Sequence, residues 1–549
     1  MSGICGFVGD AAPGTLEAML AAIEYRGDRT DIALAPGVGL GSRWWGGRPG
    51  KSPGILRQGP HLVACAWWDG EKRRLTVARD PFGVRSLYYA VHGGVLYFAS
   101  ELKQLLAVPG FEVALEPTAI HKYLTFSFVP GENVPLRGVK RVPAGHVGTF
   151  EQGRLSATPY FTLRGQLDPA LEEQGAAVRR IRGLCRNAVQ RRLNGEPEVA
   201  LYLSGGIDSS GVAVWLKEAG VKVRAFTLDF GERSVEREQA EQVARQLELP
   251  LTLVRASGED IGPALMDLVW KLDLPFGDAV TGPHFLLGRA AREAGFSAVF
   301  NGEGGDQLFG GWTSKPMIAA TVYGDLYEGQ QEEPEEVYLR SYHRFYGLEE
   351  ELYSPAFREQ VGGPGQRRSL LRPYLGSPEN PSFLNRVRLA DIALKGTQNI
   401  LPRAERIANA WALDMRVPLF DRALAEASFS LPPQLKLHGA CEKYVLKLAL
   451  QGKLPDDIIW RRKYGMSVPS TDWVLGPLAP VMEDLLGPES LRRRGMFREE
   501  FIAGLRQGRD LPGETRRRRI GEKLWALAML EAWMRVFVDG RGRRPGGTT

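Results

Sequence analysis

One stretch of sequence, residues 199–210, limits the possible folds of this chain more than any other. It begins with Val-Ala-Leu-Tyr-Leu, an apolar run that suits a buried strand, and then breaks into Ser204-Gly205-Gly206. Residues 209–217 have the apolar spacing of a helix. Backbone N–H groups at a helix N-terminus attract anions, and glycines let a ligand approach the backbone closely. The stretch therefore predicts an anion-binding turn between a strand and a helix.

The polar side chains of this stretch add a second constraint. Ser204, Ser209 and Ser210 supply hydroxyl donors for phosphate oxygens, whereas Asp208 would repel a bare phosphate. An acid inside a phosphate-binding turn is consistent with a divalent cation between the two. No Gly-x-x-x-x-Gly-Lys-Ser/Thr occurs, so the turn is not a Walker loop. Ser-Gly-Gly-Ile-Asp-Ser instead resembles the pyrophosphate loop of the ATP pyrophosphatases, although a plain glycine turn that caps a helix could have the same sequence.

Length and composition indicate a globular chain with two domains. Its 549 residues allow more than one core, and 44% are hydrophobic and 24% charged. No apolar stretch approaches the ~20 residues that span a bilayer, and we see no signal-peptide pattern at the start. The four cysteines form no Cys-x-x-Cys pair, which favours a reducing compartment over a zinc site. We therefore expect a cytoplasmic protein without membrane contact.

The chain has a formal charge of +6 and contains arginine clusters at residues 492–494 and 516–519. Aromatic residues are not interleaved with these clusters, as they would be in a nucleic-acid-binding surface. We interpret them as a solvated helix face, with a docking surface for an acidic partner or peptide as the alternative. Residues 541–549 are rich in Gly and Arg and are predicted to form a disordered tail.

Residues 1–165 alternate short β-like runs with glycine turns, which predicts a mostly-β first domain. Four motifs resemble the glutaminase half of the asparagine synthetase family: residues 1–7 (Met-Ser-Gly-Ile-Cys-Gly-Phe), 25–28 (Tyr-Arg-Gly-Asp), 78–83 (Ala-Arg-Asp-Pro-Phe-Gly) and 98–103 (Phe-Ala-Ser-Glu-Leu-Lys). The resemblance implies an N-terminal-nucleophile hydrolase fold, that of a class II glutamine amidotransferase. In that family a cysteine follows the initiator Met, and its thiol attacks glutamine with its own α-amine as base.

The first domain departs from this pattern at the positions that carry its chemistry. Ser2 stands where the family has the nucleophilic cysteine, and a hydroxyl is far less ionised than a thiol at neutral pH. Only a short Gly- and Pro-rich link separates Arg43 from Ala66, so the segment with the glutamine-binding Asn-Gly-Glu and a downstream Asp is missing. Cys5 is not N-terminal and lacks the α-amine base. We therefore expect a degenerate glutaminase domain that packs against the second domain and shields its active site.

Residues 166–540 change to helices that alternate with apolar strands, which predicts a doubly wound α/β domain with a parallel sheet. The run Val223–Phe230 reads as a second strand of this sheet. Ligands of such sheets lie beyond the carboxyl ends of the strands. By analogy with the nucleotide contacts of the family, Leu203 and Leu228 would flank the adenine of ATP.

Residues 299–311, Val-Phe-Asn-Gly-Glu-Gly-Gly-Asp-Gln-Leu-Phe-Gly-Gly, place two acids among five glycines after an apolar strand. This run resembles the Ser-Gly-Glu-Gly-x-Asp-Glu-Leu-Phe-Gly-Gly motif of the asparagine synthetase family. The resemblance implies that Asp208 and Asp306 bind the Mg²⁺ that bridges the pyrophosphate and that Glu303 assists adenylation or removes a proton from the amine. The implied contacts to ATP are made by Leu203, Ser204, Gly205, Gly206, Asp208, Ser209, Leu228, Asn301 and Gly302.

Two further runs resemble the family. Arg403-Ala404-Glu405-Arg406 is expected to form a salt-bridged helical scaffold around the site. Lys463, in Arg-Arg-Lys-Tyr-Gly-Met, matches a family lysine that would stabilise charge near the α-phosphate. Glu303 stands where relatives that close β-lactam rings have tyrosine, which favours the aspartate-amidating branch.

These observations predict an ATP-dependent amide-forming ligase of the asparagine synthetase type, with ATP and Mg²⁺ as cofactors. A carboxylate, expected to be aspartate, would become an acyl-adenylate with release of pyrophosphate and would then react with ammonia or an amine. Two alternatives stay open: a cyclase of the same family that forms a lasso-peptide macrolactam or a β-lactam, and a non-catalytic paralogue. The expected partners are small-molecule substrates, with a peptide or a second copy of the chain as further options and no nucleic acid.

Overall fold

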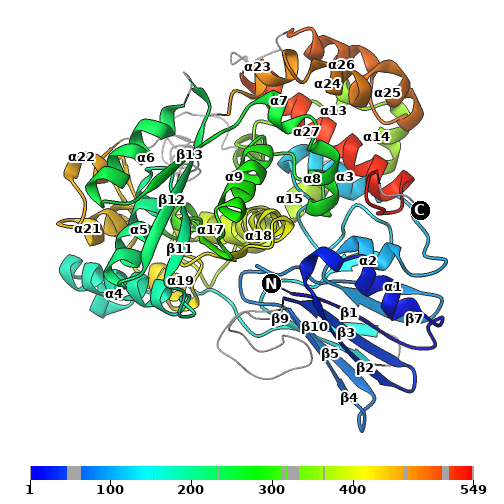
Figure 1. Ribbon diagram of the computed structural model, residues 1–549, viewed down its shortest axis with the longest axis horizontal. Helices are drawn as coiled ribbons and strands as arrows, with labels where there is room; N and C mark the ends of the chain where they lie inside the picture. Colours follow the sequence, from blue (N-terminus) through cyan, green and yellow to red (C-terminus); the bar gives the residue numbers. More distant parts are fainter. Residues whose placement is uncertain are drawn as a thin grey trace.

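A computed structural model describes residues 2–45, 64–151, 154–231, 234–311, 317, 333–362, 365–461, 468–509 and 518–546. Figure 1 shows a β-rich N-terminal part beside a larger part in which helices surround a sheet. No described helix is long and apolar enough to cross a membrane.

The N-terminal part is built from two antiparallel sheets that face each other. Ile4, Leu96 and Phe98 of one sheet share an apolar cluster with Leu75 and Val77 of the other. Because successive residues of a strand point to opposite faces, the neighbouring side chains turn toward the helices on the outer face. The first sheet has the order β2 (Arg29–Ala35), β3 (Val38–Trp44), β1 (Ser2–Val8), β7 (Val95–Ala99), β6 (Tyr88–His92), β8 (Val139–Arg141). The second has the order β10 (Arg154–Pro159), β9 (His146–Glu151), β5 (Arg74–Ala78), β4 (Cys65–Asp69).

The second part contains a five-stranded parallel sheet, as predicted for a doubly wound domain. Its order is β13 (Leu251–Arg255), β12 (Lys222–Asp229), β11 (Glu198–Tyr202), β14 (Ala298–Phe300), β15 (Asp414–Arg416). From β11 the chain first adds strands on one side of the sheet and later on the other, so the strand order reverses between β11 and β14. Such a reversal opens a crevice at the carboxyl ends of the two strands, where ligands of these folds bind.

Helices complete both parts. Those packed on or near the sheets are η1 (Glu24–Arg26), α1 (Thr15–Ala21), α2 (Leu102–Leu106), α3 (Pro117–Phe126), η2 (Pro169–Leu171), α4 (Gln174–Gln190), α5 (Ile207–Glu218), α6 (Val235–Gln246), α7 (Gly258–Ile261), α8 (Leu265–Leu272), α9 (Thr281–Glu293) and α10 (Gly305–Phe309). Later in the chain follow α12 (Pro334–Arg340), α13 (Glu349–Leu352), α14 (Pro355–Val361), α15 (Gly365–Ser369), α16 (Arg372–Leu375), α17 (Phe383–Ala390), the π-helix η4 (Asp391–Ile400), α18 (Leu401–Ala410), α19 (Arg422–Ser430) and α20 (Pro433–Lys436). After a two-stranded hairpin, β16 (Leu437–His438) and β17 (Cys441–Glu442), come α21 (Tyr444–Leu450), α22 (Asp456–Ile459), α23 (Ser470–Leu475), α24 (Ala479–Leu486), α25 (Pro488–Arg494), α26 (Glu499–Arg506), α27 (Arg518–Met534) and the π-helix η5 (Arg535–Asp539).

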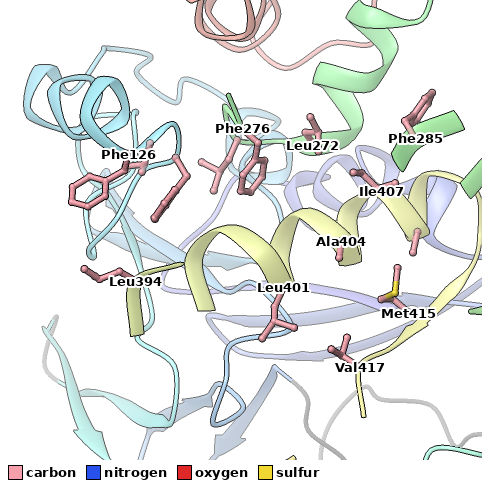
Figure 2. Packing of buried hydrophobic residues seen from close by; sticks show 14 of the residues in the cluster. Phe126, Leu272, Phe276, Phe285, Leu394, Leu401, Ala404, Ile407, Met415 and Val417 are labelled. Carbon is pink, nitrogen blue, oxygen red and sulfur yellow. The ribbon is translucent and has the colours of Figure 1, made fainter. Parts of the chain in front are cut away.

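The apolar core runs from one part into the other. Figure 2 shows Phe126 of α3 together with Leu394 of η4 and with Leu401, Ala404 and Ile407 of α18. These side chains belong to one cluster of buried residues. Helix α18 lies between the parallel sheet and the N-terminal sandwich (Figure 1). The two parts therefore meet across a shared interior.

The C-terminal segment corrects the prediction of a disordered tail at residues 541–549. Arg541 Nη2 donates to Phe111 O at 2.7 Å, and Trp270 Nε1 donates to Gly542 O at 2.8 Å. These contacts hold residues 541–546 against both parts of the chain, while residues 547–549 lie outside the described residues. The Gly- and Arg-rich composition of this segment does not predict its order, because the contacts that fix it come from distant segments.

The first arginine cluster is paired within the chain. Arg494 Nε lies 2.8 Å from Glu531 Oε2, and Arg493 Nη2 lies 3.0 Å from Glu531 Oε1. Arg492 Nη1 lies 3.3 Å from Glu499 Oε2. Acids of the same chain therefore neutralise much of the charge of this cluster. This weakens the alternative that the cluster docks an acidic partner. Residues 516 and 517 of the second cluster lie outside the described residues.

Candidate active site

A cavity of about 460 Å³ opens where the strand order reverses, beside the ends of β11, β12 and β14. Its walls come from the loops after these strands and from η4, α18 and the start of α21. The described residues predicted to bind ATP, metal or the reacting groups all line it: Leu203, Ser204, Gly205, Gly206, Asp208, Ser209, Leu228, Asn301, Gly302, Glu303 and Asp306. Lys463 lies outside the described residues. Residues more than 100 positions apart thus meet as the two sequence motifs predict.

The turn after β11 lies at the cavity and is shaped by a glycine. Gly205 has φ +73°, and a Cβ there would lie 2.4 Å from the backbone carbon of Gln239, so only glycine fits. Ser209 Oγ accepts from Ser204 N at 3.2 Å, which closes the turn around the first residues of α5. The N–H groups of the first helical turn are left pointing outward. Ser210 differs from the prediction, because its side chain is fully buried and does not line the cavity.

Two carboxylates from different loops converge in the cavity. Asp208 lies in the first turn of α5 and Asp306 in the first turn of α10. The ammonium of Lys443 contacts Asp208 Oδ2 and lies 2.7 Å from Asp306 Oδ1. A Cβ on Gly305 would lie 2.0 Å from Asp208 Oδ1, so this glycine makes room for the carboxylate. The two carboxylates therefore lie close enough to bind the same cation.

Lys443 is a site residue that the sequence analysis did not assign. Its side chain is 3% exposed, and its backbone has φ +57°, a left-handed conformation that is uncommon outside glycine. Burial alone would lower the pKa of Lys443, but Asp208 and Asp306 outweigh it and raise this pKa. No motif spacing relates this lysine to the two acids, so its place in the site is seen only in the structure.

The donor set suits a divalent cation. Two carboxylates that already share one cation offer the hard oxygen ligands that Mg²⁺ prefers, and water or phosphate oxygens can complete an octahedron. Asp208 and Asp306 would hold such an ion directly beside the N-terminus of α5.

Glu303 follows β14 and reaches the cavity between acidic and basic neighbours. Its backbone N–H donates to Asn301 Oδ1 at 3.2 Å, which fixes the loop. Burial raises the pKa of Glu303, Arg403 and Lys395 lower it, Asp306 raises it, and the net direction is upward. Glu303 therefore lies within electrostatic reach of both the acid pair and a basic group of side chains.

Arg403 belongs to a row of alternating charges along the cavity wall. Asp278 Oδ2 accepts from Arg403 Nη1 at 2.7 Å and from Asn399 Nδ2 at 2.8 Å. Asp278 Oδ1 also lies 3.4 Å from Arg344 Nη2, and Arg344 Nη1 donates to Glu522 Oε2 at 2.6 Å. Burial would raise the pKa of Asp278, but Arg403 and Arg344 hold it below its usual value. The four charged residues of this row line the cavity.

The run Arg403–Arg406 forms the buried ion pairs that the sequence predicts. On the cavity side Arg403 pairs with Asp278, as described above. On the opposite side Glu405 Oε1 accepts from Arg26 Nη1 of the N-terminal part at 2.9 Å. Helix α18 therefore connects the walls of the cavity to the first domain by charge as well as by apolar packing.

Comparison with known proteins agrees with this geometry. The sequence profile of the family described as asparagine synthase matches residues 180–535, well over half of the chain. This chain belongs to the asparagine synthase family. A profile described as a glutamine amidotransferase domain also matches residues 56–161.

Individual relatives of this asparagine synthase family member are distant in sequence. Asparagine synthetase [glutamine-hydrolyzing] 1 of Bacillus subtilis is 24% identical over 503 residues, covering 87% of this chain and 78% of the relative. A putative asparagine synthetase [glutamine-hydrolyzing] of Mycobacterium tuberculosis is 28% identical over 450 residues, 76% of this chain and 69% of the relative. Amidase chyE of Penicillium rubens is 26% identical over 495 residues, 79% of this chain and 73% of the relative. Family membership makes the chain a carbon–nitrogen ligase that uses ATP.

The N-terminal part retains the amidotransferase scaffold, and the cysteine of its first strand is poorly placed to act as a nucleophile. Cys5 is fully buried in β1, and burial raises the pKa of its thiol. Ser2 begins β1 and pairs with Trp44 of β3. Arg43 Nε donates to the backbone carbonyl of Gly27 at 2.9 Å, a structural contact. A thiol that is buried and protonated is a weak nucleophile.

We predict that the purified protein releases no glutamate from glutamine above the background of a Ser2→Ala variant. A glutamate-release assay with glutamine as the only nitrogen source checks this, with ammonium chloride as the parallel nitrogen source for amide formation. A hydrolysis rate that falls on Ser2→Ala or Cys5→Ser substitution would show that the first domain is a working glutaminase.

Proposed function

We propose that this protein activates a carboxylate, most simply the side chain of aspartate, as an acyl-adenylate and then converts it to an amide with ammonia or an amine. The observation that supports this reaction is the convergence of Asp208, Asp306 and Glu303 on a glycine-bounded cradle at the crevice of a parallel sheet. Such a reaction needs a binding turn for phosphates, two acids for a metal ion, and a separate carboxylate.

The residues divide the cavity into two ends. ATP would place its adenine beside Leu203 and Leu228 and its phosphates at the N-terminus of α5, where Ser204 and Ser209 shape the turn. Mg²⁺ held by Asp208 and Asp306 would neutralise charge on the departing pyrophosphate. The acid substrate would take the other end, beside Glu303 and the row of alternating charges.

The reaction has two steps. An oxygen of the substrate carboxylate attacks the α-phosphorus of ATP, the bond to the β-phosphate breaks, and pyrophosphate leaves. The nitrogen of ammonia or an amine then attacks the acyl carbon, AMP leaves, and the proton lost from nitrogen passes to Glu303. Lys443 stays close to the phosphates and offsets their charge, and Lys463 would do the same at the α-phosphate.

The charged row supports a small substrate with charges of both signs. Asp278 and Glu522 alternate with Arg344 and Arg403 along the wall, which suits an amino acid with one ammonium and two carboxylates. The arginine clusters would favour a peptide acid as substrate. Residues 492–494, however, are paired with acids of the same chain, so they do not support a peptide substrate. All four cysteines are free, which is consistent with a reaction in the cytoplasm.

Replacing Glu303 by Gln should lower the rate of amide formation by about 10²–10⁴-fold, the usual contribution of a general base. Only the deprotonated carboxyl accepts a proton, and its pKa is raised. The wild-type rate should therefore rise with pH through a pKa above the ordinary carboxyl range and then level, whereas the variant should lack this limb. Steady-state amide synthesis measured against pH tests it, with Glu241→Gln on α6, outside the cavity, as the matched control. An unchanged profile in Glu303→Gln would remove Glu303 from the chemistry.

ATP–pyrophosphate exchange screened with candidate acids tests the function as a whole. We expect exchange with L-aspartate and Mg²⁺, and none without an acid. Exchange that requires a peptide acid would indicate a cyclase of the same family. No exchange with any acid, although ATP binds, would indicate a non-catalytic paralogue and would contradict the proposal.

A further inference from the structure

The segment formed by η4 and α18 (residues 391–410) has one face toward the cavity and another toward the N-terminal domain. On the cavity face, Lys395, Ile400 and Arg403 line the wall, and Asn399 Nδ2 donates to Asp278 Oδ2 at 2.8 Å. These residues lie at the end of the cavity that the acid substrate would occupy. The geometry of this segment therefore sets the shape and charge of that end.

The opposite face of η4 is held by the N-terminal domain through Gln398. Its Oε1 accepts from Arg141 Nη1 at 2.7 Å and from the backbone N–H of Gly131 at 2.7 Å. Its Nε2 donates to Ala393 O, five residues earlier, at 2.9 Å. Arg141 is itself fixed, because Nη1 also donates to Val129 O at 3.2 Å. One side chain thus links the end of β8 and the loop at Gly131 to the backbone of the π-helix.

The π-helical geometry makes this link consequential. A π-helix has wider turns than an α-helix, is rare, and is frequently found at functional sites. The side chain of Gln398 binds Ala393 O across the turn that carries Lys395, and Asn399 is the next residue in the chain. A shift of Gln398 would therefore move Lys395, which lines the cavity, and Asn399, which binds Asp278 of the cavity wall.

We propose that Gln398 is a positioning residue through which the degenerate N-terminal domain fixes Lys395 and Asn399 for the acid substrate. This inference rests on the proposed function and adds a role for a domain that has no catalytic work of its own. Gln398 does not touch the substrate; it acts through its neighbours on η4. The nucleotide end of the cavity is built by other loops and does not depend on this contact.

The test compares Gln398→Met with Gln398→Glu in the full chain. Methionine keeps the length of the side chain but removes the acceptor for Arg141 and Gly131, whereas glutamate keeps the acceptor oxygen. Gln190→Met, at an exposed position on α4, is the matched control. Two measurements are made: the KM values for L-aspartate and for ATP in pyrophosphate exchange, and hydrogen–deuterium exchange of peptides that cover residues 391–400.

We expect Gln398→Met to raise the KM for L-aspartate about tenfold, in line with the loss of a hydrogen bond to a charged donor, while the KM for ATP stays within about twofold. Amide exchange in residues 391–400 should accelerate in this variant. Gln398→Glu keeps the acceptor for Arg141 and Gly131 but loses the donor to Ala393 O, so its KM for L-aspartate should stay within about twofold of the wild-type value. Equal changes in both KM values, or wild-type exchange of residues 391–400 in Gln398→Met, would overturn the positioning role. Absence of aspartate-dependent turnover in the wild type would instead contradict the proposed function, and amide exchange alone would then decide the inference.

Discussion

Replacing Asp208 or Asp306 by Asn is expected to lower ATP–pyrophosphate exchange by about 10³-fold or more, because either change removes half of the charge that would hold Mg²⁺ at the pyrophosphate. The ammonium of Lys443, which contacts both carboxylates in the wild type, would keep one partner in each variant. The fold should therefore persist, with a thermal midpoint close to that of the wild type. Exchange assays, together with electron paramagnetic resonance of Mn²⁺ bound with ATP, measure the loss directly.

A matched control comes from the neighbouring strand. Asp229 ends β12 at the same edge of the sheet, pairs with Arg237 at 3.2 Å and does not line the cavity. Asp229→Asn should retain exchange and Mn²⁺ binding. If both Asp208→Asn and Asp306→Asn retained exchange, the metal assignment would be wrong, and Lys443 would remain as the cation of the site.

Glu405→Gln should lower the free energy of unfolding by about 3–5 kcal/mol, the usual cost of breaking a buried ion pair from one side. Glu405 is 2% exposed and accepts hydrogen bonds from Arg26 and Arg85 of the N-terminal domain. Its loss would leave Arg26 with Glu101 and Arg85 with Asp414 as remaining partners, so the buried network would lack one of its negative charges. Urea denaturation followed by tryptophan fluorescence measures the change, and the junction between the domains should be the first region to lose protection from hydrogen exchange.

The pH dependence of this effect follows from the pKa of Glu405. Burial would raise that pKa, but Arg26, Arg85 and Arg406 outweigh it and lower it to about 2. A carboxyl whose folded pKa lies below its unfolded value contributes stability that is present above the unfolded pKa and is lost as pH falls toward the folded one. The difference between wild type and Glu405→Gln should therefore shrink as pH falls from about 4.5 to about 2.

Glu426→Gln provides the contrast. Glu426 pairs with Arg422 on the surface of α19, with the two side chains 48% and 58% exposed, so the change should cost no more than about 0.5 kcal/mol. Equal destabilisation by Glu405→Gln and Glu426→Gln would mean that the junction between the domains does not depend on buried charge.

Local sequence signals predicted the parts of the site that depend on local structure. A strand, a glycine turn and a helix start at residues 199–210, and the glycines around Asp306 leave little freedom in how these loops fold. Both loops end strands of one parallel sheet, so their meeting follows from the doubly wound fold. The glycine turn before α5 and the meeting of Asp208 with Asp306 could therefore be predicted from the sequence.

Contacts between segments that are distant in the chain could not be predicted from the sequence. Lys443 reaches the acid pair from a left-handed residue before α21, and no spacing rule connects it to Asp208, 235 positions earlier. Gln398 joins the domains through an amide, a side chain without a sequence signature. Residues 541–546 are ordered by Trp270 and Phe111, which no property of the tail itself indicates.

The most direct test of the account is to follow the carboxylate oxygens through a single turnover. With L-aspartate labelled with ¹⁸O in its side-chain carboxyl, ATP, Mg²⁺ and ammonium, attack at the α-phosphorus transfers one labelled oxygen to AMP. We predict ¹⁸O in the phosphate of AMP and unlabelled pyrophosphate. Labelled orthophosphate together with ADP would place the attack at the γ-phosphorus and would contradict the account.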